Sequence, residues 1–373
     1  MRDVLDSLLT WWRAGQPVGL ATVTNTWSSA PRQPGAAMAV GPDGTVAGSV
    51  SGGCVEGAVY ELCREVAETG VARLVRFGVS DDDAFEVGLT CGGTIELLIE
   101  RVDRDTFPFL PELAAEIAAD RPVALLSRLP ADDGGEVRHL LLAAGDRVGS
   151  LGSDRVDDAA GDDGLGLLTA GRTGVLHYGP DGERRGEGLA VLVASFAPPA
   201  RMLVFGATDH AAATAGIGSF LGFRVTVCDA RPVFATARRF PSADEVVVDW
   251  PHRYLAAEAE AGRIDGRTVL CVLTHDPKFD VPVLEVALRL PVAYVGAMGS
   301  RRTHDDRLKR LQETGLTDAE LARLSSPVGL DLGARTPEET AVSIAAEIVA
   351  LRWGGTGSRL TATSGRIHPD ASA

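Results

Sequence analysis

Two cysteines in the first half of the chain stand beside paired glycines. Cys54 follows Gly52 and Gly53 where a strand-like run meets a helix-like run, and Cys91 precedes another glycine pair. Glycines let a ligand approach the main chain closely, and the N–H groups at a helix start favour an anion or a thiolate. The residues around Cys54 therefore predict a reactive sulfur beside an anion site. A small buried cysteine in a tight turn would explain them equally well.

The remaining cysteines and an acidic run give weaker signals. The spacing of Cys54 and Cys91 matches no structural zinc template, so the pair suggests a shared site for a soft ligand or for sulfur. Asp81-Asp82-Asp83 is most simply a solvated loop, with metal binding as a minor alternative. Three cysteines lie within helix or strand patterns and are predicted to be core residues: Cys63, Cys228 and Cys271.

In the second half, the first strand-to-helix turn lies where a dinucleotide fingerprint belongs. Gly206 supplies the tight turn, and Asp229, which ends the next strand, is placed to bind a ribose hydroxyl. Thr208 stands where the second glycine of the fingerprint would be, and its side chain impedes a pyrophosphate. The residues thus indicate the fold strongly and NAD binding weakly. The alternative is a Rossmann scaffold that has no cofactor or that binds a different nucleotide.

Polar and charged residues also follow the fourth and fifth strands of this half. His275, Asp276 and Lys278 come after the fourth strand, at the edge where doubly wound folds bind ligands, so we expect a functional loop rather than a solvated turn. A helix start with local positive charge, suited to an anion, follows the fifth strand at Gly299, Ser300, Arg301 and Arg302. These arginines could instead pair with Asp305 and Asp306. Arg335 belongs to a further glycine–arginine turn.

The elements that must position these residues divide the chain at 196–201, where two prolines separate two strand-like runs. Residues 1–196 are predicted to form a mixed α+β domain and residues 201–353 a doubly wound, Rossmann-like α/β domain, because β-branched runs alternate there with helical patterns. A disordered tail is predicted over 354–373. In the second domain we expect strands at 202–205, 224–228, 245–249, 268–273 and 292–295, and helices at 211–221, 253–261, 281–290, from 302, and 336–353.

The first domain is less regular. Gly41-Pro42-Asp43-Gly44 predicts a hairpin turn that joins strands at 36–40 and 46–50. The acidic, glycine-rich stretch 157–166 fits no clear pattern. Further helices are expected at 3–14 and 55–69, and further strands at 18–24, 74–77, 94–100 and 189–196.

Composition excludes several classes of protein. The chain has 373 residues, of which 45% are hydrophobic and 23% charged, which is typical of a globular protein. A formal net charge of −15 argues against a broad surface for nucleic acid or anionic membrane. Five cysteines without a dense framework indicate reduced thiols in a cytoplasmic protein. We expect neither a signal peptide nor a membrane span.

The ordered motifs resemble the xanthine dehydrogenase accessory family (XdhC/CoxI), whose members assist molybdenum hydroxylases. The resemblance covers nearly the whole chain, to about Trp353. One departure lies at the first strand-to-helix turn. Many relatives have Gly-x-Gly-His there, whereas this chain has Gly206-Ala207-Thr208-Asp209-His210, with the histidine one residue later. The motifs that carry the resemblance are 29–35, 48–56, 90–94, 229–231, 274–280, 296–302 and 329–338.

The resemblance implies a chaperone rather than a turnover enzyme. Such a protein would bind molybdenum cofactor, as molybdopterin or its dinucleotide form, and support its sulfuration by a cysteine desulfurase. It would then deliver the cofactor to an apo-hydroxylase of the xanthine dehydrogenase type. Cys54, and secondarily Cys91, would lie near the molybdenum or its sulfur, and the phosphate end would lie on the helix starts after Gly206 or Gly299.

Motifs and resemblance together give the candidate residues for cofactor binding, and none is predicted to be catalytic. Two other functions stay open. One is an NAD(P)-dependent oxidoreductase with a degenerate fingerprint, and the other is a scaffold that binds a dehydrogenase subunit; homodimerisation is also left open. The candidates are Arg32, Gly52, Gly53, Cys54, Glu56, Cys91, Gly206, Asp229, His275, Asp276, Lys278, Gly299, Ser300, Arg301, Arg302 and Arg335.

Overall fold

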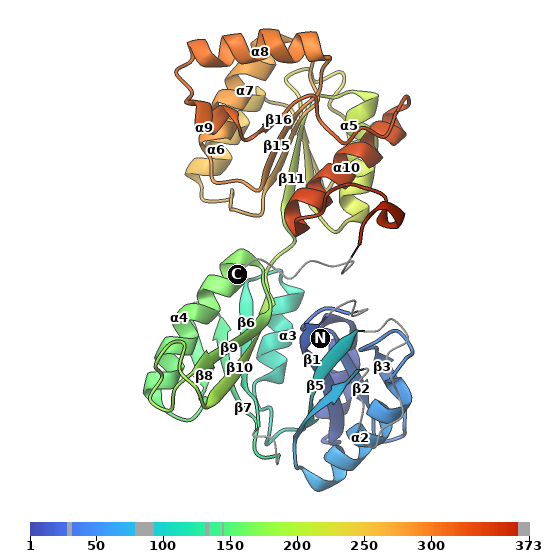
Figure 1. Cartoon of the computed structure of the whole chain (residues 1–373), viewed down its shortest axis with the longest axis vertical. Helices are drawn as coiled ribbons and strands as arrows, with labels where there is room; N and C mark the ends of the chain where they lie inside the picture. The colour runs from blue at the N-terminus through green and yellow to red at the C-terminus, as the bar shows by residue number, and fades with distance from the viewer. Residues whose placement is uncertain (28–31, 79–92, 131–133, 144, 365–373) are drawn as a thin grey trace. The chain divides into compact units, whose positions relative to one another are not determined.

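The computed structural model describes residues 1–27, 32–78, 93–130, 134–143 and 145–364. The chain forms two compact units and passes from one to the other between Pro198 and Pro199 (Figure 1). Among the described residues, the strands of the first unit form two antiparallel sheets and those of the second unit form one parallel sheet. The mixed first half and the doubly wound second half that the sequence predicts are therefore confirmed.

In the first unit, each sheet has five strands. The first has the order β3-β2-β1-β5-β4 and the second the order β8-β7-β6-β10-β9. The strands are β1 (Val18–Trp27), β2 (Ala37–Val40), β3 (Val46–Gly48), β4 (Arg73–Phe77), β5 (Thr94–Val102), β6 (Val123–Arg128), β7 (Arg138–Ala143), β8 (Asp146–Gly149), β9 (Gly174–Tyr178) and β10 (Leu189–Phe196). The helices are η1 (Arg2–Val4), α1 (Leu5–Arg13), α2 (Glu56–Thr69), α3 (Leu110–Ala118) and α4 (Asp154–Ala170).

Helices cover the outer face of each sheet and part of the space between the sheets. α2 packs Val59 and Val66 on the face of the first sheet that carries Ile95 and Leu97. α4 packs on the outer face of the second sheet. Between the sheets, α1 and α3 share one apolar cluster with residues of both, including Leu20 on β1. The alternation of side chains along β5 thus separates an α2 face from a face turned towards the second sheet.

The hairpin predicted at 41–44 is confirmed. β2 and β3 pair antiparallel, with Met38 opposite Gly48 and Val40 opposite Val46. The Asp43 carboxylate accepts a hydrogen bond of 3.0 Å from the Thr45 N–H group, which is the local contact that favours aspartate in turns.

The stretch 157–166, which fits no pattern in the sequence, lies within α4. The Ser153 hydroxyl caps this helix by accepting a hydrogen bond from the Val156 N–H group. Glycine is a poor helix former, but a Cβ atom at Gly164 would lie 3.2 Å from both Leu126 and Leu142. Close packing on the second sheet therefore explains a glycine that weakens the sequence signal.

The second unit has the strand order β13-β12-β11-β14-β15-β16, with all neighbours parallel. This is the order of a Rossmann sheet, in which the direction of winding reverses beside the first strand. The strands are β11 (Arg201–Phe205), β12 (Arg224–Cys228), β13 (Glu245–Val247), β14 (Val269–Val272), β15 (Tyr294–Ala297) and β16 (Leu324–Ser325). The helices are α5 (Asp209–Phe220), α6 (Pro251–Glu260), α7 (Pro277–Arg289), α8 (Arg301–Glu313), α9 (Asp318–Leu321), α10 (Pro337–Trp353) and η2 (Leu360–Ala362).

Helices cover both faces of this parallel sheet. α5 and α10 pack on the face that carries Met202 and Val204, whereas α6, α7 and α8 pack on the face that carries Leu203 and Phe205. Figure 1 shows the two groups of helices on either side of the strands. The carboxyl ends of the strands, with the turns that follow them, form the edge where such folds bind ligands.

One predicted helix boundary is wrong. The sequence analysis begins the helix after the fourth strand at 281, but α7 begins at Pro277. Asp276 is its N-cap and Pro277 occupies its first turn, where proline is well tolerated. Lys278 and Asp280 therefore lie on a helix rather than in a loop.

Residues 354–364, the described part of the predicted tail, are exposed. Residues 365–373 lie outside the described residues. Among the described residues, no helix combines the length and the apolar character needed to cross a bilayer.

Candidate functional site

The loop that carries Cys54 lies between β3 and α2. The Ser51 hydroxyl oxygen accepts hydrogen bonds from the N–H groups of Cys54, at 2.9 Å, and Val55, at 3.1 Å. α2 begins at Glu56, so Cys54 precedes the helix by two residues instead of starting it. Its side chain is half-buried against the apolar cluster under α2. The loop thus holds a sulfur atom near the surface and close to a helix start.

The backbone N–H groups of this loop converge on the carboxylate of Glu56. Glu56 accepts hydrogen bonds from the N–H groups of Ser51 at 2.8 Å, Gly52 at 3.0 Å and Gly53 at 2.8 Å. It also accepts hydrogen bonds from the hydroxyls of Ser49, at 2.6 Å, and of Ser51. The sequence predicts an anion on these N–H groups, and in the structure the anion is the protein's own side chain.

Positive φ angles at two glycines bring these N–H groups together. Gly52 has φ +76° and Gly53 has φ +118°, values that other residues rarely adopt. A Cβ atom at either position would have no heavy atom of the described residues within 4 Å. Among the described residues, glycine is therefore required there for backbone conformation rather than for space.

The Glu56 contacts predict a pH-dependent stability. Partial burial acts to raise the pKa of Glu56, but the hydrogen bonds from Ser49 and Ser51 outweigh it and hold the pKa at about 2, below the ordinary 4.5. A carboxyl whose pKa is lowered on folding stabilises the folded state above its unfolded pKa. That contribution is lost as the pH falls from 4.5 towards 2.

We expect Glu56→Gln to lower the free energy of unfolding at pH 7 by about 1 kcal/mol, a value discounted for the partial exposure of the carboxylate. The deficit should shrink as the pH approaches 3, since the wild-type protein loses the same contribution there. Urea unfolding at both pH values measures it, with Glu61→Gln on the exposed face of α2 as the control. An equal deficit at both pH values would contradict this account.

Of the other two candidates in the first unit, Arg32 contacts Asp3 rather than the Cys54 loop, and Cys91 is not among the described residues. Arg32 forms an ion pair of 3.0 Å with Asp3 at the surface. Cys91 lies outside the described residues, as do 29–31 of the same motif set and the acidic run 81–83. Within the described ranges, His, Cys, Asp and Glu side chains form no group of three that could hold a metal ion.

In the second unit, Gly206 and Asp229 lie together at the carboxyl edge of the sheet. Gly206 has φ +114°, and a Cβ atom there would lie 2.9 Å from Thr274 and 3.0 Å from the carbonyl carbon of Leu273. Only glycine therefore fits between the ends of β11 and β14. The Asp229 carboxylate accepts a hydrogen bond of 2.7 Å from the next N–H group, that of Ala207.

Arg231 supplies the other hydrogen bonds to the Asp229 carboxylate. It donates to Asp229 from its backbone N–H group at 2.8 Å and from its guanidinium at 2.9 and 2.8 Å. Burial acts to raise the pKa of Asp229, but the bonds from Arg231 and Ala207 lower it overall. Both oxygens are occupied, and the Ala207 N–H group of the turn that would hold a pyrophosphate is already bonded. This arrangement disfavours the ordinary mode of dinucleotide binding.

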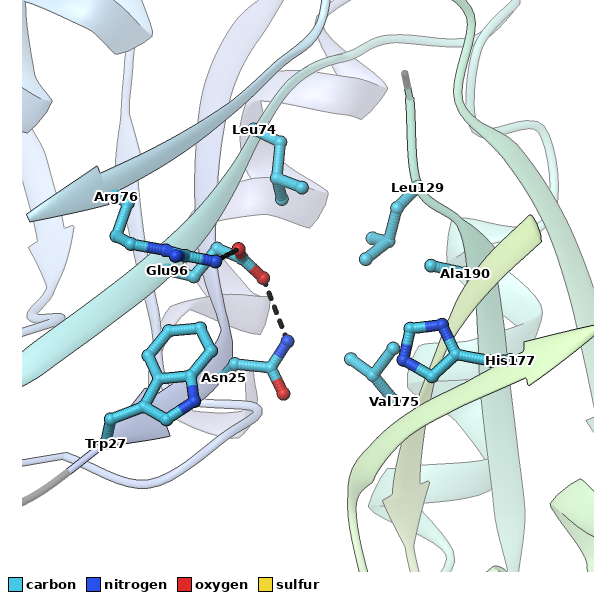
Figure 2. Close-up of a pocket in the computed structure, with 9 residues that line it drawn as sticks. All are labelled: Asn25, Trp27, Leu74, Arg76, Glu96, Leu129, Val175, His177 and Ala190. Atoms are coloured by element: carbon cyan, nitrogen blue, oxygen red, sulfur yellow. Dashed lines mark hydrogen bonds and ion pairs between the residues drawn. The ribbon is translucent and has the colours of Figure 1, made fainter. Parts of the chain in front are cut away.

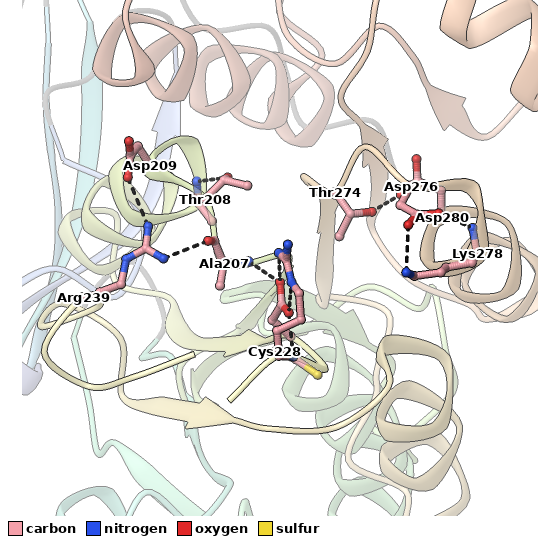
Figure 3. Close-up of polar contacts among 12 residues, drawn as sticks. Ala207, Thr208, Asp209, Cys228, Arg239, Thr274, Asp276, Lys278 and Asp280 are labelled. Carbon is pink, nitrogen blue, oxygen red and sulfur yellow. Dashed lines mark hydrogen bonds and ion pairs between the residues drawn. The ribbon is translucent and has the colours of Figure 1, made fainter. Parts of the chain in front are cut away.

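Across the same edge, residues of α7 form a second polar group (Figure 3). The Asp276 carboxylate accepts a hydrogen bond of 3.1 Å from the Lys278 N–H group and forms an ion pair of 3.0 Å with its ammonium group. These bonds, with the charge of Arg231, lower the pKa of Asp276. Asp276 thus belongs electrostatically to the Asp229 group, whereas the neighbouring His275 is exposed.

Beneath this edge, Asp280 and Arg307 form a buried ion pair of 2.9 Å. Arg307 also donates to the Met298 carbonyl at 2.7 Å and to the Ser326 hydroxyl at 3.0 Å, while Thr274 donates to Asp280. Burial raises the pKa of Asp280 to about 6, although the hydrogen bond and charge of Arg307 act to lower it. Through Asp280 and Arg307, Thr274 after β14 is thus linked to Met298 after β15.

The start of α8 keeps its two arginines available. Ser300 is the N-cap and accepts a hydrogen bond of 3.1 Å from the Thr303 N–H group. Arg301 and Arg302 are exposed, and neither makes an ion pair with any residue that the structure describes. The alternative pairing with Asp305 and Asp306 is therefore absent among the described residues.

Arg335 lies before another capped helix. The Glu339 carboxylate accepts a hydrogen bond of 2.7 Å from the Arg335 backbone N–H group, and Thr336 and Glu339 cap α10 reciprocally. The side chain of Arg335 is exposed.

Comparison with known proteins finds a family model that matches each of the two units. The family model described as the XdhC Rossmann domain matches residues 202–348, and the model described as the XdhC and CoxI family matches residues 11–78. The chain belongs to the XdhC and CoxI family.

Relatives of this XdhC and CoxI protein span nearly its whole length. The molybdenum cofactor insertion chaperone PaoD of Escherichia coli is 28% identical over 351 residues, which cover 94% of this chain and 88% of PaoD. A protein of Bacillus subtilis described as a probable subunit of xanthine dehydrogenase is 25% identical over 335 residues, covering 89% and 92% of the two chains. A solved structure described as a xanthine dehydrogenase of Bacillus halodurans has a TM-score of 0.66 and 25% identity, covering 96% and 97%.

Sequence reasoning missed several residues that shape these sites in the XdhC and CoxI chain. Arg307 lies in the middle of α8, where an arginine on a helix predicts only a surface charge. Ser49 and Ser51 stand inside the quoted motif, but nothing in their spacing shows that both bond to Glu56. The signal that could have found this arrangement is Glu56, three residues after Gly53. In a capping box, a glutamate likewise accepts a hydrogen bond from the N–H group three residues before it.

Proposed function

We propose that this protein is a chaperone that binds molybdenum cofactor and delivers it to a molybdenum hydroxylase of the xanthine dehydrogenase type. One observation carries the proposal: 28% identity to a molybdenum cofactor insertion chaperone across 94% of this chain. A match over both units favours a shared task for the whole protein rather than a shared fold alone. In this proposal the cofactor is cargo, and its sulfido ligand comes from a cysteine desulfurase.

The first unit suits the metal end of such a cargo. Molybdenum with dithiolene and sulfido ligands is a soft centre, and Cys54 offers a soft sulfur atom. Cys54 is half-buried, and the neighbouring Gly52 and Gly53 are exposed. Glu56 holds this backbone in place but leaves no N–H group of Ser51, Gly52 or Gly53 for a phosphate. We therefore assign the metal, rather than the phosphate, to this loop.

The second unit has two candidate turns for a phosphate, and we favour the turn at Gly299–Arg302 over the turn at Gly206. At the Gly206 turn, the Ala207 N–H group already donates to Asp229 and is not available to an anion. At the start of α8, by contrast, the helix dipole and the exposed side chains of Arg301 and Arg302 attract one. The phosphate of the cofactor is accordingly proposed to bind at the Gly299–Arg302 turn.

Replacing Cys54 tests the metal assignment. We expect Cys54→Ala and Cys54→Ser to retain at least about tenfold less molybdenum cofactor after gel filtration, because neither variant offers a soft ligand. The measurement is molybdenum and released pterin per chain. Glu61→Ala, on the exposed face of the helix that follows the loop, is the control and should retain as much as wild type. Unchanged retention in both Cys54 variants would remove the cysteine from the proposal.

A further inference from the structure

In the first unit, the exposed aromatic ring beside the pocket between the two sheets is already covered. The pocket has a volume of about 390 Å³, and the Trp27 indole that lines it has the Arg76 guanidinium 4.5 Å from its ring centre (Figure 2). Arg76 also donates a hydrogen bond of 3.0 Å to the Glu96 carboxylate, which accepts another of 2.8 Å from Asn25. A charged side chain therefore lies over this ring, and Trp27 is not free to pack on a partner.

In the second unit, α5 has an apolar side that faces away from the sheet. Ala211 and Ala215 pack into the apolar cluster on the sheet. Ala213, Ile217 and Phe220 follow one another at intervals of four and three residues, so they lie together on another side of the helix. The first two are partly exposed, and Phe220 is 86% exposed. Phe220 thus leaves most of its apolar surface in water, which favours a partner that covers it.

The neighbouring helix α10 repeats this spacing. Ile344 and Ile348 pack into the same cluster on the sheet. Val342, Ala346 and Val349 again follow one another at intervals of four and three residues; Ala346 is partly exposed, and the two valines are 49% and 43% exposed.

The two apolar sides belong to one layer of the fold. α5 and α10 pack against each other on the same side of the sheet (Figure 1). Because each helix turns its buried side to the sheet, the exposed sides lie on the outer surface of this layer. We name this surface the α5–α10 face and define it by Ala213, Ile217, Phe220, Val342, Ala346 and Val349.

The α5–α10 face is apolar on an acidic chain. Residues 211–221 include no charged side chain, and residues 340–351 include only Glu347. The Glu347 carboxylate is bound within the unit, where it accepts hydrogen bonds from the Tyr294 hydroxyl and, at 2.9 Å, from the Gly329 N–H group. The formal net charge of the whole chain is −15. Contact through this face therefore depends on apolar area and not on ion pairs.

Charge and symmetry favour a second copy of the chain as the occupant. A basic partner would be attracted to carboxylates, and the six residues of the α5–α10 face offer none. A second copy presents the same two apolar stripes, so a two-fold axis can lay one helix pair on the other with apolar groups on both sides. Such a contact meets where the two acidic chains carry no charge, which keeps their mutual repulsion low.

The size of the face fits a dimer that can dissociate. α5 has 12 residues and α10 has 17, so the helices are about 18 Å and 25 Å long. Two adjacent helices of about 11 Å diameter give a face roughly 22 Å wide, or roughly 500 Å² on each copy. Two copies would bury about 1,000 Å² in total, the lower limit for a specific interface, which predicts micromolar rather than nanomolar affinity.

We propose that the α5–α10 face is a homodimer interface, in which two copies pack these helices against each other around a two-fold axis. Phe220 would bury the most apolar surface on association, because it is the most exposed residue of the face. The proposal goes beyond the chaperone function and is tested on protein without cofactor. Its failure would therefore leave the chaperone function unaffected.

Sedimentation equilibrium of the cofactor-free full chain tests the interface. Wild type should show a monomer–dimer equilibrium with a Kd between about 1 and 100 µM. Phe220→Ser and Val349→Glu should each raise this Kd at least about tenfold, through lost apolar contact and through burial of a carboxylate in each copy. Leu165→Glu is the matched control, because Leu165 is a similarly exposed apolar residue on α4 of the first unit, and it should leave dimerisation unchanged.

Salt distinguishes this interface from one held by ion pairs. Raising NaCl from about 50 mM to about 500 mM should strengthen the dimer, because screening weakens the repulsion between two acidic chains. A dimer that salt weakens would contradict an apolar interface.

Two further results would overturn the proposal. One is a monomer at every concentration up to about 500 µM, which would leave the face to a partner of another kind. The other is dimerisation that stays undiminished in both Phe220→Ser and Val349→Glu. Circular dichroism of each variant shows whether it is folded, so that a change in Kd is assigned to the face and not to unfolding.

Discussion

Arg307→Met is expected to lower the free energy of unfolding by about 3–5 kcal/mol, because it leaves Asp280 buried without its partner. The side chains of Arg307 and Asp280 are only 3% and 5% exposed. The arginine also satisfies the Met298 carbonyl and the Ser326 hydroxyl, and methionine can do neither. Urea unfolding of the full chain, followed by circular dichroism, measures the loss. Arg310→Met, on the exposed side of the same helix, should change stability by less than about 0.5 kcal/mol.

The pH dependence of this loss gives a sharper test. The pKa of Asp280 is about 6 when folded and 3.8 ordinarily, so this carboxyl makes the wild-type protein less stable as the pH rises between those values. Removing Arg307 raises the folded pKa further, because the charge that favours ionisation is gone. The deficit of Arg307→Met should therefore be smaller at pH 5 than at pH 8. A deficit that is larger at pH 5 would contradict the assignment of a buried pair.

His139→Leu should be comparably harmful in the first unit, with a loss of about 3–5 kcal/mol. His139 on β7 reaches across to Glu100 on β5, at 2.9 Å, and its other ring nitrogen lies 2.9 Å from the Ser127 hydroxyl. The side chains of His139 and Glu100 are 4% and 5% exposed, and Phe107 packs on the imidazole with ring centres 4.6 Å apart. The variant leaves the Glu100 carboxyl group buried between the sheets with no hydrogen-bond donor among the described residues.

Two further variants separate this explanation from a simple loss of packing. Arg138→Leu changes the neighbouring residue on the same strand, whose ion pair with Glu136 is at the surface, and should be nearly neutral. Glu100→Leu combined with His139→Leu removes both partners and should be more stable than His139→Leu alone, since an apolar pair replaces a buried carboxyl group that has lost its partner. A double variant no more stable than the single one would show that volume, rather than the carboxylate, causes the loss.

Both pairs show what the sequence could not predict. Asp280 and Arg307 are 27 residues apart and Glu100 and His139 are 39 apart, so neither helical nor strand periodicity relates them. The second unit was predictable because each parallel strand is buried on both faces and reads as a continuous apolar run. β16 has only two residues and produces no such run.

Local rules failed where packing outweighed propensity. Gly164 reduces the helical signal of α4, yet the helix forms because it packs on the second sheet, so closely that a Cβ atom at Gly164 would lie 3.2 Å from Leu126 and Leu142. Asp276-Pro277 is a helix start by the same rule that correctly identified Thr336-Pro337, but its charged neighbours suggested a loop. The candidate residues at the carboxyl edge could be predicted because each follows a strand of the parallel sheet. The hydrogen bonds between them could be found only in the folded structure.

The Glu56 carboxylate determines how the Cys54 loop responds to an incoming molecule. Its N–H groups already have an acceptor, so the loop keeps one shape whether or not a ligand is present. Under the proposed function, a cargo that docks at this loop would therefore lose little conformational entropy in ordering it. If the proposed cargo binds here, selection for a soft centre depends on the Cys54 sulfur atom, because the backbone around it offers the same preformed surface to any other molecule.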